Sequence, residues 1–170
     1  MNISEYLGQM FDYTYWANKR YLAVAEGLSE EQLYRPHGHS WGDVHGIFLH
    51  MMSSETAWLK RWHGESPTGH LGKDEYPTLA AVKLNWQKVE NEMREFLASQ
   101  KESSLLEPRK YANFSGQVFT VPLWQMLAHI PNHETHHRGE LAAMFAIMEI
   151  PHPEEEVIQY FLDLSGQKKA

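Results

Sequence analysis

The chain has 170 residues, 42% of them hydrophobic and 12% aromatic, which suits one globular domain over residues 1–170 and excludes an intrinsically disordered chain. It contains no cysteine, so disulfides, a thiolate nucleophile and cysteine-based zinc sites are excluded. The net charge of −7 argues against nucleic-acid binding, and the lack of an apolar run of about 18 residues or of a secretory signal predicts a cytoplasmic protein with no membrane partner.

Helical periodicity begins at the amino terminus. Apolar residues recur at three- and four-residue steps from Ile3 to Leu28, which predicts an amphipathic helix of about 25 residues. After a loop that contains Pro36, a second helix is expected to begin at Ser40 as its N-cap, with Asp43 in a capping-box relation. Its apolar stripe consists of Val44, Ile47, Phe48, Met51, Trp58 and Trp62.

Two further long helices follow in the second half of the chain. One is predicted to open around Pro77 and to continue through Phe96, after a loop rich in glycine and proline. Residues 100–120 indicate an irregular crossover with a short hairpin. The fourth helix should start near Pro122, because proline suits the first helical turn, and Pro131 should bend it or remove one backbone hydrogen bond.

The carboxy-terminal part predicts one more, shorter helix. Pro151 and Pro153 should stop the fourth helix at about Ile150, and the last helix is expected to begin with the acidic residues 154–156. Four long helices with two long connections predict an all-α four-helix bundle with an extra carboxy-terminal helix.

Histidine is unusually frequent, with 11 residues, and the fourth helix carries His129, His133 and His137 at four-residue intervals. Residues four apart lie about 40° apart around a helix and about 6 Å along it, so neighbouring pairs can share one metal ion. The whole ladder is about 12 Å long, so two of the three would be ligands and a third ligand would come from elsewhere. His50, at the border of the second helix's apolar stripe, is a candidate. A single histidine on an amphipathic helix is more often a core or boundary residue, so spacing alone only suggests the site.

The same segment also contains the H-E-x-x-H pattern at residues 133–137. In zinc metallopeptidases the two histidines bind the ion and the glutamate, here Glu134, is the general base. The longer metzincin pattern is absent, and the turn at Pro151 disfavours His152 or Glu149 as a third ligand. A peptidase is therefore the weaker interpretation.

Three short motifs, in order, resemble those of the DinB/YfiT-like family of metal-dependent enzymes. They are Y-x-x-W-A-N at residues 13–18, His50 followed by Glu55 and Trp58, and H-x-x-x-H-R-G at residues 133–139, with Glu140 where glutamine is common. The resemblance covers nearly the whole chain. It implies a DinB-like four-helix bundle, often a homodimer, with a divalent metal ion, zinc or nickel, on His50, His133 and His137.

The resemblance also guides the function. Characterised relatives include transferases that use a low-molecular-weight thiol such as bacillithiol, so a metal-dependent thiol S-transferase acting on a small electrophile is the leading hypothesis. Its physical basis is that a cation on neutral imidazoles lowers the pKa of a coordinated thiol. The alternatives are a metal-dependent hydrolase that uses a metal-bound water, and a non-catalytic metal-binding stress-response module.

Three charged residues near the motifs have open roles. Glu55 lies on the apolar stripe and is either a partner of the site or a buried carboxylate bonded to another side chain. Glu134 lies beside the metal or faces a neighbouring helix, and either carboxylate is a candidate base for hydrolysis. Arg138 is expected to form a surface salt bridge rather than to bind a substrate carboxylate.

Overall fold

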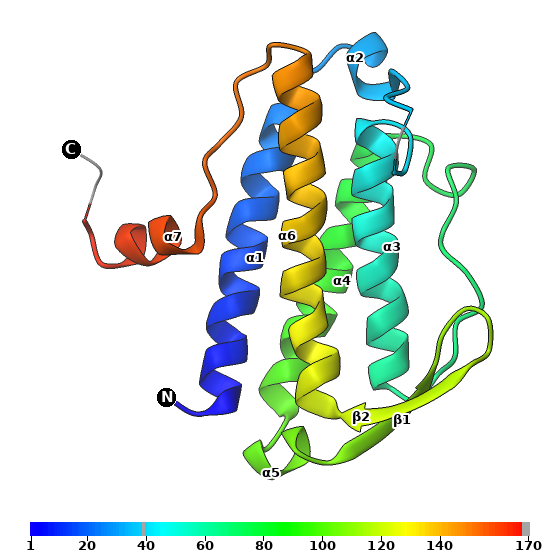
Figure 1. Ribbon diagram of the computed structural model, residues 1–170, viewed down its shortest axis with the longest axis vertical. Coiled ribbons are helices and arrows are strands. Elements are labelled where there is room, and N and C mark those ends of the chain that lie inside the picture. Colours follow the sequence, from blue (N-terminus) through cyan, green and yellow to red (C-terminus); the bar gives the residue numbers. More distant parts are fainter. Residues whose placement is uncertain (39, 168–170) are drawn as a thin grey trace.

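The computed structural model describes residues 1–38 and 40–167 and consists mainly of four long helices (Figure 1). The predicted all-α four-helix bundle is confirmed. The long helices are α1 (Ile3–Ala25), α3 (Val44–Trp62), α4 (Leu79–Ser99) and α6 (Leu123–Ile147), joined by α2 (Glu30–Tyr34), α5 (Glu102–Leu105) and the strands β1 (Pro108–Ala112) and β2 (Val118–Pro122), and followed by α7 (Val157–Leu164).

Helices α3 and α1 each pack against both α4 and α6, and α3 is the more deeply buried of the two. Nearly all of its side chains are buried, including Ile47, Phe48 and Met51. The polar residues His50 and Glu55 are buried with them. Because unpaired polar groups are costly in a core, these two residues call for a specific explanation.

The start of α3 differs from the sequence prediction. Ser40 has a positive φ of 50°, so it belongs to a turn, and the N-cap is Asp43, whose carboxylate accepts a hydrogen bond from the Gly46 amide at 2.6 Å. A side chain on Gly46 would bring its Cβ to 2.2 Å from the Trp41 carbonyl oxygen. Glycine at position 46 therefore lets the preceding turn lie directly against the helix.

The predicted hairpin is present and leads directly into α6. β1 and β2 pair antiparallel, with Pro108 opposite Pro122 and Ala112 opposite Val118. Helix α6 continues through Pro131 and ends at Ile147, three residues before the predicted end. Glu149, with φ of 57°, turns the chain away there. Short helices α2 and α5 were not predicted.

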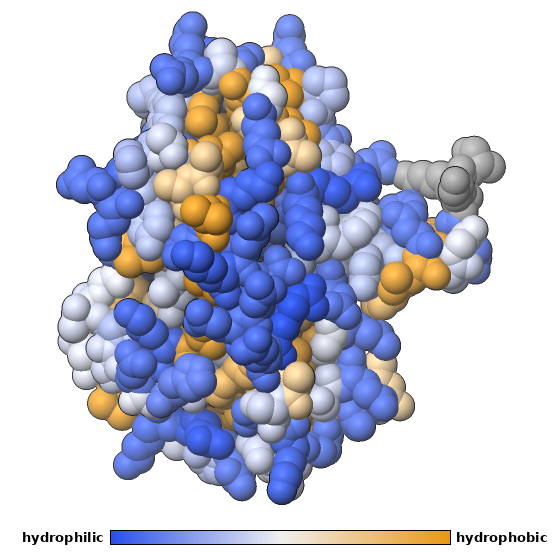
Figure 2. Space-filling view, turned by 180° about the vertical axis from the view of Figure 1, so that it is seen from behind, coloured by the Kyte–Doolittle hydropathy of each residue, from blue (hydrophilic) through white to orange (hydrophobic). Residues whose placement is uncertain are grey.

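The carboxy-terminal segment runs back along the outside of α1 and α6 before α7 (Figure 1). Helix α7 begins at Val157, so the three acidic residues precede it and Glu156 is only its N-cap. Figure 2 shows the molecule from behind the view of Figure 1. This face is mostly hydrophilic, and the segment that bears α7 projects from its side. Within the described residues, no helix is both long and apolar enough to cross a membrane.

Candidate metal centre

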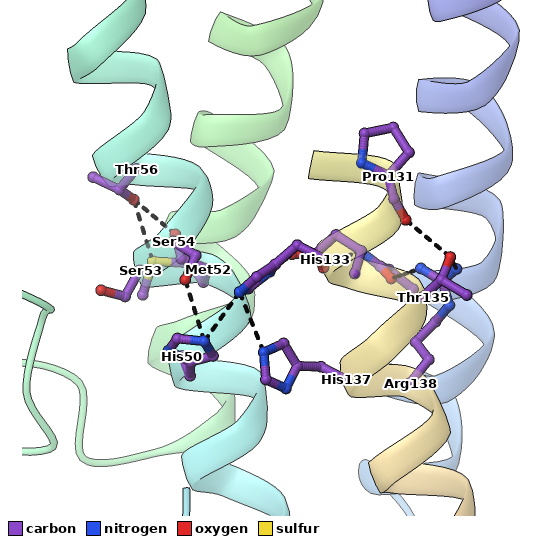
Figure 3. Close-up of polar contacts among 12 residues, drawn as sticks. His50, Met52, Ser53, Ser54, Thr56, Pro131, His133, Thr135, His137 and Arg138 are labelled. Atoms are coloured by element: carbon purple, nitrogen blue, oxygen red, sulfur yellow. Dashed lines mark hydrogen bonds and ion pairs between the residues drawn. The ribbon is translucent and has the colours of Figure 1, made fainter. Parts of the chain in front are cut away.

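Three imidazoles from two helices converge at one point between α3 and α6 (Figure 3). The Nε2 atom of His133 lies 3.2 Å from Nε2 of His50 and 3.2 Å from Nε2 of His137. Nitrogen ligands about 2.05 Å from a tetrahedral ion lie roughly 3.3 Å from one another. These three residues therefore have the spacing and the chemistry to hold one divalent ion, and the sequence prediction that they meet is confirmed.

The outer nitrogens of the two α6 histidines face carboxylates. His133 Nδ1 lies 3.4 Å from Oε1 of Glu134, and His137 Nδ1 lies 2.7 Å from Oε2 of Glu140. An imidazole that donates its Nδ1 proton to a carboxylate keeps its Nε2 lone pair free for a metal ion. Burial alone would raise the pKa of Glu140, but hydrogen bonds from His137 and Ser40 bring it below its ordinary value.

His50 is held by stacking instead of by a carboxylate. The ring of Trp41 lies parallel to it, with centroids 3.8 Å apart, and Ser54 Oγ lies 3.4 Å from its Nε2. Its Nδ1 is buried and has no hydrogen-bond partner among the residues that the structure describes. Burial, followed by the neighbouring His137 and His133, lowers the pKa of His50 to about 2. His50 is therefore neutral and able to bind a cation.

Aromatic residues from the loops surround the cluster. His70, from the loop after α3, makes edge contacts with Trp41 and Phe114, at centroid distances of 5.0 and 4.5 Å, and with His50 at 4.7 Å. Its Nδ1 lies 3.2 Å from Ser53 Oγ. Sequence analysis did not single out His70, because a histidine in a glycine-rich loop has no periodicity to place it.

His129, the third member of the histidine ladder, lies outside the cluster. Its ring is 5.5 Å from that of His133 and 4.7 Å from that of Trp58, and burial, with smaller contributions from His133 and Arg61, lowers its pKa to about 4. A second group of His136, His137 and Glu140 also has atoms close enough to hold an ion, but His136 is exposed. The group of His50, His133 and His137 is the better site because it joins two helices, α3 and α6, and none of its members is exposed.

Arg138 lies on the side of α6 away from His50 (Figure 3), and the amide of Asn18 links it to the buried Glu134. Glu134 is fully buried, and its Oε2 accepts a hydrogen bond from Asn18 at 3.0 Å. The salt bridge predicted for Arg138 is present, with Glu155, but the prediction that it lies on the surface is wrong. Its side chain is completely buried and bonds to Asn18, Tyr13, Thr135 and Glu155. Sequence spacing could not reveal this, because the acidic partner comes from the carboxy-terminal segment.

Glu55 is fully buried, and neither of its carboxylate oxygens has a hydrogen-bond partner among the described residues. Burial, followed by the nearby charge of Glu134, raises its pKa well above the ordinary value. The nearby indole of Trp86 lowers the pKa of Glu55 and so reduces the increase, although the indole N–H is not in hydrogen-bond geometry with the carboxylate. Glu55 is thus a buried carboxyl group in the core behind the site, with no bond to a ligand histidine.

Neither extra ligand considered for a peptidase reaches the cluster. His152 lies beside Tyr21, with ring centroids 6.3 Å apart, and Glu149 occupies the turn after α6. Glu134, the base of the peptidase pattern, is behind His133 rather than on the side where the three Nε2 atoms meet. The H-E-x-x-H residues therefore do not form a metallopeptidase site, because Glu134 lies at Nδ1 of His133 and not beside the point where an ion would bind.

Comparison with known proteins agrees with the motifs. The sequence profile of the DinB family matches residues 1–148. The chain is 21% identical over 147 residues to protein DinB of Bacillus subtilis strain 168, covering 84% of this chain and 86% of that protein. A crystal structure of a DinB-like protein from Bacillus cereus ATCC 10987 superposes with a TM-score of 0.62 at 17% identity, over 85% of this chain and 94% of the other. This chain is a member of the DinB family.

Proposed function

We propose that the protein is a metal-dependent S-transferase that activates a low-molecular-weight thiol of the bacillithiol type. The thiol loses its proton to solvent, its sulfur forms a bond to a carbon of a small electrophile, and the leaving group of the electrophile, such as a halide, departs. The metal ligands in this proposal are His50, His133 and His137, and zinc or nickel is the expected ion. When bound, such an ion lowers the pKa of a coordinated thiol and supplies no base of its own.

The main support for the proposal is that the carboxylates near the site contact the Nδ1 atoms of the imidazoles and not the point where the Nε2 atoms meet. Glu134 and Glu140 both lie behind the imidazoles, at Nδ1, where they fix the tautomer and orientation of the ligands. A hydrolase of the kind considered above needs a base within reach of the attacking water, on the Nε2 side. A thiol needs none, because its proton is already acidic enough to be lost to solvent once a cation binds the sulfur.

The surroundings of the cluster also suit a bulky reaction partner. Trp41, His70 and Phe114 form an aromatic rim beside the ligands, and Trp41 is 41% exposed. Such a surface contacts the flat or apolar part of an electrophile and displaces water from it. The absence of cysteine from the chain agrees with a sulfur atom that arrives with the cosubstrate.

The test is thiol consumption by protein loaded with zinc or nickel. Monobromobimane or chlorodinitrobenzene would be offered with bacillithiol, glutathione or cysteine, and turnover should require both metal and thiol. His137→Ala should abolish it. His63→Ala is the matched control, because His63 is an exposed histidine at the end of α3 and away from the cluster.

The alternatives have distinct outcomes in the same experiment. Turnover of an ester or amide substrate without thiol, lost in Glu134→Gln with metal retained, would replace the transferase with a hydrolase. Metal binding with no turnover of either kind would leave a non-catalytic metal-binding module.

A further inference from the structure

We infer that the carboxy-terminal segment 151–156 controls the metal affinity of the histidine cluster through four side chains, Glu155, Arg138, Asn18 and Glu134. The inference rests on the metal site of the proposed function, but not on its thiol chemistry. It assigns positioning roles to residues on the opposite side of α6 from the site.

The first link joins the segment to α6. Arg138 is fully buried, and its Nε donates to a carboxylate oxygen of Glu155. Its Nη2 donates to Tyr13 Oη at 3.2 Å and to Thr135 Oγ1 at 2.8 Å. Tyr13 in turn donates to the backbone carbonyl of Glu155 at 2.8 Å. The segment is thus anchored through both the side chain and the backbone of one residue.

The second link is the amide of Asn18, on α1. Its Oδ1 accepts from Arg138 Nη1 at 2.8 Å, and its Nδ2 donates to Glu134 Oε2 at 3.0 Å. An arginine is only a donor and an ionised carboxylate is only an acceptor, so the amide has one orientation that satisfies both. Asn18 is 3% exposed. Loss of the arginine on one side would free the amide on the other.

The third link reaches the ligand. The other oxygen of Glu134, Oε1, lies 3.4 Å from His133 Nδ1. His133 is the central ligand, because its Nε2 is 3.2 Å from the Nε2 atoms of both His50 and His137. A small rotation of this one ring therefore changes two of the ligand separations at once.

This coupling extends beyond the family's shared region. The DinB match ends at residue 148, whereas Glu155 belongs to the segment that follows. The groove of about 1030 Å³ between this segment, α1 and α6 is lined by Tyr13 and Thr135, and the segment is the outer wall of it. Segment 151–156 contributes no residue to the main hydrophobic core cluster, and it is tied to α1 and α6 by the polar contacts of Glu155. Linkage requires the effect to be reciprocal, so metal binding should strengthen the docking of the segment.

The experiment measures zinc affinity by competition with a chromophoric chelator, without any thiol substrate. Glu155→Gln removes the charge that holds Arg138, and it should weaken zinc binding by about tenfold, the lower end of the effect typical of residues that orient a ligand. Tyr13→Phe, which removes both the bond to the Glu155 carbonyl and the acceptor for Arg138 Nη2, should weaken it in the same direction. Glu156→Gln is the matched control, since Glu156 is exposed and its side chain makes no capping bond, and it should bind zinc like the wild type.

A double-mutant cycle tests the route. If the effect passes through Glu134, then Glu155→Gln should have little further effect on zinc affinity in a Glu134→Gln background. In the wild type, zinc should slow amide hydrogen exchange in residues 151–158, and this slowing should be lost in Glu134→Gln.

Unchanged zinc affinity in folded Glu155→Gln and Tyr13→Phe would overturn the inference, as would fully additive effects in the cycle. The outcome is separate from that of the proposed function. If the wild type binds zinc but consumes no thiol, only the transferase proposal is contradicted. If the wild type binds neither zinc nor nickel, both the transferase proposal and the role of segment 151–156 are contradicted.

Discussion

The indole ring of Trp41 lies over the imidazole of His50, with ring centroids 3.8 Å apart and planes inclined by only 12°. The stack depends on Gly46, because any side chain there would collide with the Trp41 carbonyl. The turn before α3 therefore orients a histidine seven residues after the N-cap Asp43. In the described part of the chain, no side chain forms a hydrogen bond with the outer nitrogen of that histidine.

This stack makes Trp41 a reporter of metal binding. Nickel bound to His50 should quench tryptophan fluorescence, and Trp41→Phe should lose most of that quenching while still binding the ion. Titration of both proteins with nickel measures it. Trp16→Phe, on the outer part of α1, should retain the full change, and equal quenching in Trp41→Phe and the wild type would place the ion elsewhere.

Metal loading should raise the thermal stability of the wild type. At an ion concentration of 100 times Kd, binding to the folded state alone contributes about 2.7 kcal/mol. His50→Ala and His133→Ala should lose this increase in Tm, measured with and without zinc in a thermal melt. His136→Ala should keep it. The reverse pattern would move the site to the exposed group of His136, His137 and Glu140.

Substitutions of Asp43 and Gly46, in the turn before α3, should lower the free energy of unfolding by different amounts. Asp43→Ala removes an N-cap and should cost about 1 kcal/mol in urea denaturation. Gly46→Ala should cost more and also weaken metal binding, since the Trp41 backbone must move. Thr78→Ala, which removes the cap of α4, is the control: it should match Asp43→Ala in stability but leave metal affinity intact. Gly46→Ala that binds metal normally would contradict the role given to the turn.

Glu55 should make the protein less stable as the pH rises. Its pKa in the folded protein is well above the ordinary value, because of burial and then the charge of Glu134, so the folded state retains a proton that the unfolded chain releases. Stability from this group is then greatest below pH 4.5 and falls, by at most about 1.4 kcal/mol per pH unit, until the folded-state pKa is reached.

The isosteric variant Glu55→Gln removes that dependence. Unfolding free energies measured by urea between pH 5 and 8 should fall less steeply for Glu55→Gln than for the wild type. Glu65→Gln serves for comparison, since Glu65 is exposed in the loop after α3. Parallel curves for Glu55→Gln and the wild type would mean that Glu55 is not a strained buried carboxyl group.

Periodicity and turn residues were sufficient to predict the four long helices and the hairpin, since each is a local signal. Histidine spacing only suggested a metal site, and the choice of His50, His133 and His137 came from the resemblance to the DinB/YfiT-like family. The predicted start of a helix was wrong where the preceding residues form a turn. Ser40 looks like an N-cap, but the turn through Gly42 leaves that role to Asp43. Helix α2 does have a local sequence signal, the capping box of Ser29 and Gln32, but the helix is only five residues long and has no periodicity to accompany it.

What the sequence could not supply is the tertiary pairing of polar side chains. Arg138 bonds to Asn18, 120 positions away, and to Glu155 in a segment without periodicity. His70 and Phe114 meet at the site from two separate loops. No spacing rule connects such residues, because their proximity is decided by how the loops pack after the bundle has formed.

The ligands are far apart along the chain as well as close in space. His50 and His133 are separated by 83 positions, and the intervening stretch holds the whole of α4 and the hairpin. An ion bound by both histidines would close the chain between them into a loop. Such a cross-link reduces the conformational entropy of the unfolded chain. Chelation would therefore do the work of a disulfide in a chain that has no sulfur bridge, slowing the separation of α3 from α6 during unfolding.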